Sequence, residues 1–392
     1  MSLWRFLCTA LAAATLGLAS GAGAPAWAQD AAGCGSPPVR SDGWLVAAPE
    51  QAGMDAKILC GIGPRFAAWP DANAHAVLVA RHGKLVYERY FAGADQIWGQ
   101  PIGTVTYDAE KRHDLRSITK SVTSLLVGIA LDHGWLKSLD APVLSFLPEF
   151  SDLSDPDKEH ITLRHLLTMS SGLAWDESRP YSDPTNSERQ MDAAADPYRY
   201  ALAQPMAAPP GTIYNYCGCS AALLEDIIQQ TASRPLDGIA KEFLFDPLGI
   251  SDVEWTRFPN GDVLAHGGLR LRARDLAKLG QLVLKRGDWN GRRIVSTAWI
   301  DQATAPQING ESIYFYGYQW WLGRSLIARK EIDWIAGFGY GGQRLYIVPK
   351  QDLVVVVYSG AYGAPPLVGN IVLNQYVLPA LIDKPTARET QP

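Results

Sequence analysis

The chain has 392 residues, of which 47% are hydrophobic and 19% are charged, and its formal net charge is −5. This length exceeds one typical domain, and the hydrophobic content is enough to fill a substantial core. The weak negative charge excludes the basic surface that nucleic acid requires, so we expect no nucleic-acid partner. The sequence shows neither an internal repeat nor a long linker.

The first 28 residues have the pattern of a secretory signal. Arg5 precedes an apolar stretch from Phe6 to about Ala19, and an A-x-A cleavage pattern follows at residues 26–28. The apolar stretch is short for a membrane span, and no other segment is long and apolar enough to cross a bilayer. We therefore expect a signal peptide at residues 1–28, a periplasmic or secreted bacterial protein, and no membrane contact after cleavage.

Four cysteines follow the signal: Cys34, Cys60, Cys217 and Cys219. An exported protein meets an oxidising compartment, which permits disulfides. Cys34 and Cys60 can pair near the start of the mature chain, whereas Cys217 and Cys219 are too close along the chain to pair easily with each other. No His/Cys spacing is typical of a metal site, so we expect neither a metal nor another cofactor.

The β-rich segments lie at the two ends of the chain. Residues 76–91 (AVLVARHGKLVYERYF) predict a hairpin that turns at His82-Gly83. Residues 117–136 predict a buried helix, and the chain from 138 to about 264 predicts helices separated by loops rich in Pro, Gly and Ser. RARDLAKLGQLVLKRGDW predicts a further amphipathic helix. After about Tyr314, QRLYIVPKQDLVVVVYSG predicts two strands around a Pro-Lys-Gln-Asp turn, and a last helix follows.

This order predicts an α+β fold. One antiparallel sheet would be built from both chain ends and flanked by helices, with an all-helical domain inserted in the middle. We expect residues 29–392 to contain an α/β part at about 45–137 and 265–385 and a helical part at about 138–264. Clefts form at such boundaries.

Ser117 and Lys120 form an S-x-x-K motif at the start of the predicted buried helix. Residues i and i+3 share a helix face, so the two side chains point the same way. Against Val122 and Leu125 the ammonium group would be partly desolvated, which favours a neutral amine that can accept the proton of the serine. Taken alone the motif is weak, because a solvated first turn with Ser117 as N-cap explains it as well.

Four further blocks follow in one order: ITLRHLLTMSSGL, P-G-T-x-Y-x-Y, GLRLRARDLAKLGQL, and GFGYGGQ before a strand. With S-x-x-K, this order resembles the serine β-lactamase and penicillin-binding-protein superfamily over roughly Val77 to Ser359. It is most similar to the class C branch, which includes esterases, D-amino-acid peptidases and 6-aminohexanoate-dimer (nylon-oligomer) hydrolases. Tyr216-Cys217, YSDPTNSE at residues 181–188 and GYGGQRLYIVP look closest to the nylon-oligomer hydrolases.

The resemblance implies a β-lactamase-like fold and a serine hydrolase that forms an acyl-enzyme with small amides or esters. Ser117 matches the nucleophile, Lys120 its base, and Tyr216 the tyrosine that completes proton transfer to the leaving group. A phenol beside ammonium groups can be held partly ionised, and it is then a competent base. The asparagine of the family's Tyr-x-Asn motif is absent, because Cys217-Gly218 follow the tyrosine.

The strand motif also departs from the family. Gly337-Phe338-Gly339 stands where Lys/His-Thr/Ser-Gly is usual, so the cation that meets a substrate carboxylate is missing. The resemblance implies an oxyanion hole formed by the backbone N–H groups of Ser117 and Tyr340, with a slip of one or two positions left open. The residues expected to bind substrate are Trp175, Tyr181, His266, Trp320 and Gly339.

Other functions stay open at this point: a non-catalytic or weakly active cell-wall-binding relative of the penicillin-binding proteins, and a true β-lactamase or D-amino-acid peptidase. The joint presence of Ser117, Lys120 and Tyr216 favours an enzyme, since a pure binding protein does not need all three. The expected partner is a small amide or ester. The sequence does not decide between the two, nor does it give the oligomeric state.

Overall fold

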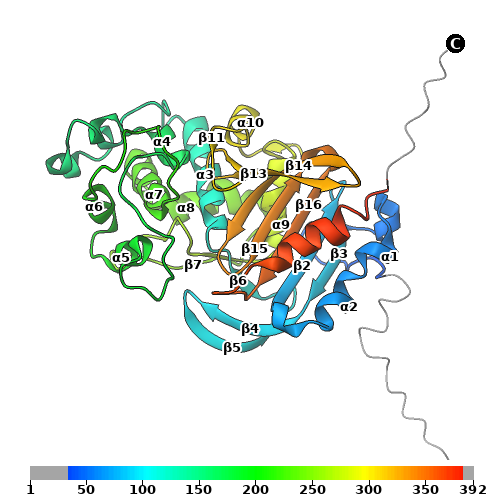
Figure 1. Ribbon diagram of the computed structural model, residues 1–392. Helices are drawn as coiled ribbons and strands as arrows, with labels where there is room; N and C mark the ends of the chain where they lie inside the picture. Colours follow the sequence, from blue (N-terminus) through cyan, green and yellow to red (C-terminus); the bar gives the residue numbers. More distant parts are fainter. Residues whose placement is uncertain (1–33, 383–392) are drawn as a thin grey trace, which may run out of the picture.

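The computed structural model describes residues 34–382, and the predicted signal peptide lies outside them. Its centre is a nine-stranded sheet with the strand order β1-β3-β2-β16-β15-β14-β13-β12-β11. Only β1 and β3 are parallel, and the other neighbouring strands are antiparallel. The pairing of β2 with β16 joins the two ends of the chain (Figure 1), which confirms the predicted α+β fold.

The strands of this sheet are β1 (Leu45–Val46), β2 (Ala74–Arg81), β3 (Lys84–Tyr90), β11 (Ile308–Asn309), β12 (Phe315–Tyr316), β13 (Trp321–Ile327), β14 (Lys330–Gly339), β15 (Gln343–Val348) and β16 (Leu353–Ser359). Smaller sheets are formed by β4 (Ala92–Ile97) with β5 (Gln100–Thr106), by β9 (Asp288–Trp289) with β10 (Arg292–Arg293), and by β6 (Arg112–Asp114), β8 (Leu269–Arg272) and β7 (Glu254–Trp255).

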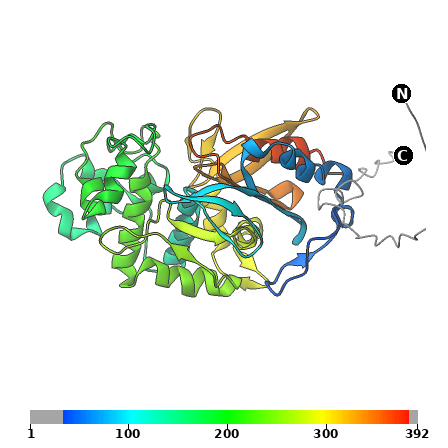
Figure 2. The ribbon, with the colours of Figure 1, turned by 90° about the horizontal axis from the view of Figure 1, so that it is seen from below.

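Helices cover both faces of the central sheet (Figures 1 and 2). Gly280 of α9 (Ala273–Leu284) lies against Leu345 and Val354, and Gly369 of α11 (Leu367–Ile371) lies against Arg344 on the opposite face. Because neither face meets bulk water, β16 reads as the continuous apolar run LVVVVYS and is buried throughout. The short helices α1 (Ala56–Leu59) and α2 (Ile62–Ala67) lie near the chain start, and α10 (Thr297–Ala303) follows β10.

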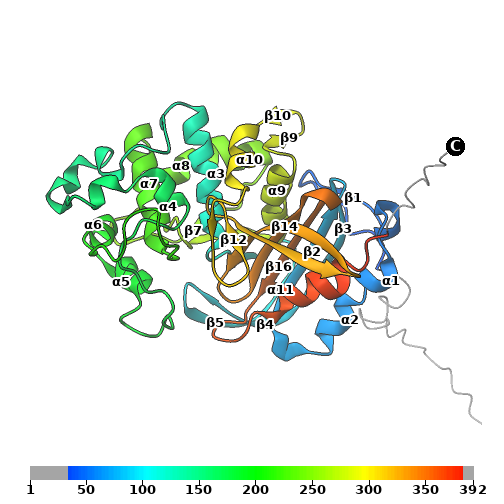
Figure 3. The same cartoon turned by 45° about the horizontal axis from the view of Figure 1, so that its top comes forward.

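The segment between α3 (Ile118–Asp132) and β8 is mostly helical and lies beside the sheet. Its helices are α4 (Leu163–Leu167), α5 (Ser187–Ala193), α6 (Pro197–Leu202), α7 (Gly218–Ala232) and α8 (Leu236–Ala240). Helix α3 packs against α7 on one side and against β14 and β15 on the other, and it therefore stands between the helical segment and the sheet (Figures 1 and 3). Side chains at its first turn reach the boundary of both.

Several local predictions are confirmed. The β2–β3 hairpin turns at His82 and Gly83, whose φ angles of 53° and 73° give the turn a left-handed backbone that matches strand twist. α9 and the β15–β16 pair also lie where the pattern places them. The β4–β5 hairpin was missed, because β5 (QPIGTVT) is mostly exposed and lacks apolar alternation.

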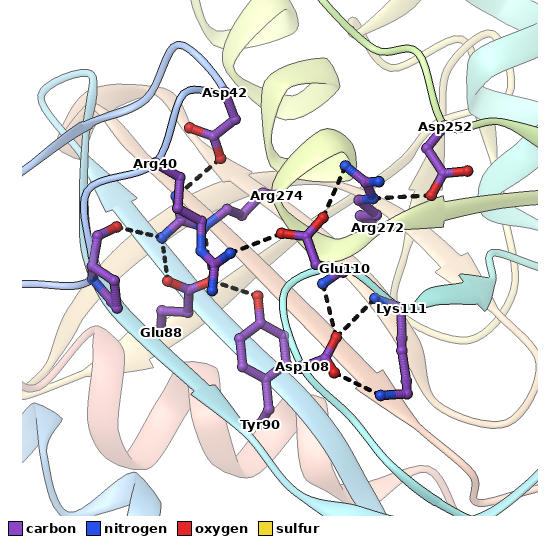
Figure 4. Close-up of polar contacts among 11 residues, drawn as sticks. Arg40, Asp42, Glu88, Tyr90, Asp108, Glu110, Lys111, Asp252, Arg272 and Arg274 are labelled. Carbon is purple, nitrogen blue, oxygen red and sulfur yellow. Dashed lines mark hydrogen bonds and ion pairs between the residues drawn. The ribbon is translucent and has the colours of Figure 1, made fainter.

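Buried charges attach the first described segment to the sheet and to α9 (Figure 4). Arg274, in the first turn of α9, donates from Nη1 to Asp42 Oδ2 over 2.9 Å and from Nε to Glu88 Oε1 of β3 over 2.8 Å. The side chains of Arg274 and Glu88 are each 3% exposed. Removal of either one would leave a buried charge without a partner, which costs several kcal/mol, roughly 3–5.

Two disulfides occur in the described part of the chain. Cys34 is joined to Cys60, as the sequence allows, and Cys217 is joined to Cys219. The second bond departs from the expectation that Cys217 and Cys219 are too close along the chain to pair easily. Cys217 is extended (φ −141°, ψ 118°) while Gly218 begins α7, and this change of direction brings the two Cα atoms within 5.2 Å.

Among residues 34–382, no helix has both the length and the apolar character that crossing a membrane would require.

Candidate active site

Ser117 stands at the N-terminal end of α3, directly after a residue with an unusual backbone. Arg116 has φ +51°, in the left-handed region that non-glycine residues rarely adopt. Its guanidinium group lies 4.5 Å from the centre of the Trp98 ring, and its Nε lies 3.3 Å from Asp114 Oδ2. These contacts hold the tight turn that presents Ser117 to a cavity of about 720 Å³.

Lys120 lies one turn further and is 1% exposed. Its ammonium group donates to Ser117 Oγ over 3.0 Å and to the backbone oxygen of His266 over 2.9 Å, and it lies 3.6 Å from Glu188 Oε2. The two side chains therefore meet, as the i, i+3 spacing predicts. The surroundings differ from the expected apolar wall, because a carbonyl and a carboxylate face the nitrogen.

Tyr216 contacts the same serine from the segment before α7. Its hydroxyl is near enough to Ser117 to interact with it, and its ring centre lies 4.9 Å from Lys120 Nζ and 5.8 Å from the ring of Trp321. Burial and the nearby Glu177 raise the pKa of Tyr216 well above its usual value, and the interaction with Ser117 opposes this only in part. The phenol is therefore un-ionised at neutral pH, which corrects the expectation of a partly ionised tyrosine.

Two carboxyl groups lie beneath these residues and were missed by the sequence analysis. Glu188, on α5, accepts a hydrogen bond from Tyr181 Oη over 2.9 Å. Glu177 accepts from Trp175 Nε1 over 2.6 Å and from the N–H of Gly218. Glu188 closes the YSDPTNSE block and Glu177 follows Trp175 by two residues, but no spacing rule connects either one to Lys120.

The carboxyl groups titrate differently because they are neighbours. Burial and the charge of Glu188 raise the pKa of Glu177 to about 8. Burial alone would also raise the pKa of Glu188, but the Lys120 ammonium and His266 lower it below its usual value. At neutral pH, Glu177 is therefore protonated and Glu188 is ionised.

The end of β14 runs directly against the segment that precedes Ser117. A side chain at Gly339 would place its Cβ 2.3 Å from the Leu115 carbonyl oxygen, so only glycine allows this approach. Tyr340 is the next residue and lies with Ser117 on the wall of the same cavity. Within the described residues, the N–H groups of Ser117 and Tyr340 donate to no backbone carbonyl. Both are free to receive a ligand oxygen.

Aromatic rings form the walls of the cavity. Trp175 and Tyr181 line it on the side of the helical segment, and the Tyr181 ring lies 4.9 Å from the ring of Tyr340 across the opening. Trp321 and Phe338 stack at 5.7 Å and line the sheet side. Among the residues predicted to bind substrate, Trp175, Tyr181 and Gly339 are therefore found at the cavity.

Trp320 and His266 are not part of the cavity wall, which corrects two expectations. Trp320 is 1% exposed and points into the core, while its neighbour Trp321 faces the cavity because successive residues of an extended chain point to opposite sides. The His266 side chain is fully buried behind Lys120, with Nε2 3.1 Å from Asp192 Oδ1. Only its carbonyl oxygen contacts the site.

Two buried groups in residues 34–382 bring His and carboxylate atoms within 4.8 Å of one another: Glu188 with Asp192 and His266, and His75 with Asp95 and His113. In the first group, the Lys120 ammonium already supplies a positive charge 3.6 Å from Glu188. In the second, His75 Nδ1 and His113 Nε2 are hydrogen-bonded at 2.8 Å, closer than two ligands of one ion stand. Neither group is assigned as a metal site.

Comparison with known proteins places this arrangement in a family. Residues 70–370 match the family model described as Beta-lactamase. The chain is 26% identical over 305 residues to a 6-aminohexanoate-dimer hydrolase from Paenarthrobacter ureafaciens, with 72% of each chain covered. It is 31% identical over 184 residues to the esterase EstB from Burkholderia gladioli, with 45% of each covered.

A solved structure shares the fold at lower identity. The hydrolase EstCE1, which has promiscuous acyltransferase activity, aligns with a TM-score of 0.66 and 17% identity, covering 85% of this chain and 99% of that one. The family match spans most of the chain and contains Ser117, Lys120 and Tyr216. The chain belongs to the β-lactamase family and is a serine hydrolase with the β-lactamase fold.

Proposed function

We propose that the protein hydrolyses small amides or esters through an acyl-enzyme formed on Ser117. The observation that carries this proposal is the hydrogen bond of 3.0 Å between Ser117 Oγ and the buried amine of Lys120 at the cavity wall. A serine hydroxyl is unreactive by itself, and an adjacent amine that takes its proton makes it a nucleophile.

In the acylation step Lys120 acts as the neutral amine, which forms when its resting ammonium group releases a proton to the solvent. Ser117 Oγ attacks the substrate carbonyl carbon and its proton passes to that amine. The N–H groups of Ser117 and Tyr340 hold the negative oxygen of the tetrahedral intermediate. The bond to the leaving group then breaks, and the leaving amine or alcohol takes the phenolic proton of Tyr216. Lys120 returns its extra proton to Tyr216, with the Lys120 nitrogen 4.9 Å from the centre of that ring.

Water completes the cycle by the reverse route. It attacks the acyl carbon and gives one proton to the neutral amine of Lys120. The bond between the acyl carbon and Ser117 Oγ then breaks, Ser117 Oγ takes that proton, and the carboxylic acid product leaves. An un-ionised Tyr216 suits this scheme because the leaving group needs a proton donor. No cofactor enters either step.

The aromatic lining of the cavity favours substrates with an apolar part. Trp175, Tyr181, Trp321 and Phe338 supply aromatic walls, and two relatives bear the names of a 6-aminohexanoate-dimer hydrolase and an esterase. A cation corresponding to the family's strand lysine is missing. A Cβ added at Gly337 would lie 3.1 Å from Ile118 Cγ2, so this position points toward α3. Arg344, which is buried and lines the cavity, has its guanidinium carbon 4.5 Å from the centre of the Phe338 ring.

We also propose that the protein is exported by the signal at residues 1–28 to the periplasm or beyond. Two disulfides in the described residues support this proposal, since such bonds persist in oxidising compartments. Mass spectrometry of the secreted protein should find its N-terminus at Gln29, and retention of residues 1–28 would contradict the proposal.

The test of the enzymatic proposal is turnover of a p-nitrophenyl ester together with labelling by a fluorescent phosphonate. Ser117→Ala should abolish both, with an unchanged melting temperature. Thr123→Ser is a suitable control on the same helix, because Thr123 is buried and bonds Ala265 away from the cavity. Undiminished labelling of Ser117→Ala would refute Ser117 as the nucleophile.

A further inference from the structure

The space where the family has an asparagine side chain is filled here by carboxyl groups from elsewhere in the chain. Gly218 stands at that motif position and begins α7. A Cβ added to Gly218 would lie 2.6 Å from Glu188 Oε2 and 3.1 Å from Glu177 Oε1. An asparagine at this position would collide with both, so the glycine and the two carboxyl groups form one arrangement.

The carboxyl groups are connected to the catalytic amine and to each other. Glu188 Oε2 lies 3.6 Å from Lys120 Nζ, and Oε2 has no hydrogen-bond donor in the described residues. The other oxygen is held by the Tyr181 hydroxyl, and the Glu177 carboxyl is close enough to Glu188 for each to shift the pKa of the other. Glu177 is itself fixed by Trp175 Nε1 and by the N–H of Gly218. The free oxygen of Glu188 is therefore aimed at Lys120.

We propose that Glu188 is a positioning residue that stabilises the ammonium form of Lys120 during proton transfer, and that Glu177 holds Glu188 in place. The inference rests on the proposed function. When Lys120 takes the proton of Ser117, it gains a positive charge, and a carboxylate at 3.6 Å lowers the energy of that state. The buried aspartate of a Ser-His-Asp triad stabilises its imidazolium in the same way.

The proton on Glu177 sets the charge of the arrangement. With Glu177 neutral, one carboxylate faces one amine, whereas ionisation of Glu177 adds a second buried negative charge close to the developing oxyanion. Activity should therefore fall as pH rises through about 8, the pKa of Glu177. The ionisable groups that surround the pair are Lys120, Tyr181, Asp192, Tyr216 and His266.

The experiment compares Glu188→Gln and Glu177→Gln in the full mature chain, with a p-nitrophenyl ester as substrate. Glu188→Gln keeps the size and removes the charge, so kcat should fall roughly 10²-fold or more while KM stays within about threefold. Glu177→Gln should retain activity at pH 7 within about tenfold, and its activity should no longer fall as pH rises through about 8. That fall is the alkaline limb of the pH profile. Glu225→Gln is the matched control, because Glu225 is a fully buried carboxyl on α7 away from the cavity, and its kinetics should not change.

Two results would overturn the inference: a kcat of Glu188→Gln within twofold of the parent, or an unchanged alkaline limb in Glu177→Gln. If Glu188→Gln fails to fold, the pH profile of Glu177→Gln still decides. Loss of activity in Ser117→Ala with full activity in Glu188→Gln would refute this inference alone. Full activity in Ser117→Ala would refute the proposed function.

Discussion

Replacement of Lys120 separates the chemical role of its amine from its role in stability. Lys120→Met keeps the length of the side chain and removes the charge. At 3.6 Å and an effective dielectric constant of about 20, the attraction between Lys120 and Glu188 is about 5 kcal/mol. Loss of one partner of such a buried pair costs roughly 3–5 kcal/mol. The single variant should therefore unfold about 5–10 °C below the parent.

The double variant Lys120→Met/Glu188→Gln removes both charges together. Since no buried ion then stays unpaired, most of the lost melting temperature should return, although turnover of the ester should stay at least about 10³-fold below the parent. Thermal unfolding by circular dichroism and steady-state kinetics measure the two effects independently. Lys120→Arg should also be inactive, because a guanidinium stays protonated.

Either of two results would refute this reasoning. A Lys120→Arg variant with near-parent kcat would show that proton transfer to Lys120 is not needed. Additive losses of stability in the double variant would show that Lys120 and Glu188 do not interact.

Three further predictions follow from other contacts. Gly339→Ala should lower the free energy of unfolding by about 1–3 kcal/mol and should also lower kcat, because its Cβ would lie 2.3 Å from the Leu115 carbonyl oxygen. Parent-like stability and kcat would contradict this close approach. Burial raises the pKa of Asp42, but the net pKa is lowered, chiefly by the hydrogen bond from Arg274. Asp42 therefore stabilises the fold above its unfolded pKa of about 4, and this stability is lost as pH falls through the folded pKa. The difference in melting temperature between the parent and Asp42→Asn should be present at pH 7 and shrink at pH 3. Because Gly337 supplies no cation, kcat/KM for nitrocefin should be several powers of ten lower than kcat/KM for a p-nitrophenyl ester. Comparable values would show that another residue binds the carboxylate of nitrocefin.

Local patterns in the sequence determine the parts of this protein that depend on neighbours along the chain. The i, i+3 spacing places Lys120 and Ser117 on one face of α3, where Lys120 Nζ lies 3.0 Å from Ser117 Oγ. The His82-Gly83 turn fixes the β2–β3 hairpin in the same way, since two left-handed residues match the twist of the paired strands.

The surroundings of Lys120 depend on tertiary packing. Glu188 arrives on α5, Glu177 on the preceding loop and the His266 carbonyl from before β8, and no periodicity in the sequence relates these segments to α3. The apolar residues near Lys120 predicted a dry wall, whereas packing of the helical segment supplied polar atoms. The ionisation of Tyr216 was misjudged for the same reason, because burial and the Glu177 carboxyl oppose the effect of the ammonium.

Side-chain direction at the cavity was likewise decided by the assembled sheet. Trp320 and Trp321 are adjacent and chemically identical, and only the pairing of Trp321 with Ala336 on β14 determines which indole faces the cavity and which enters the core. A shift of one residue in an extended chain exchanges the two faces. The sequence by itself therefore determined the α+β class and the contact between Ser117 and Lys120 on α3. The pairing of distant strands and the packing of α5 and α7 decided the walls of the cavity and the charges that surround Lys120.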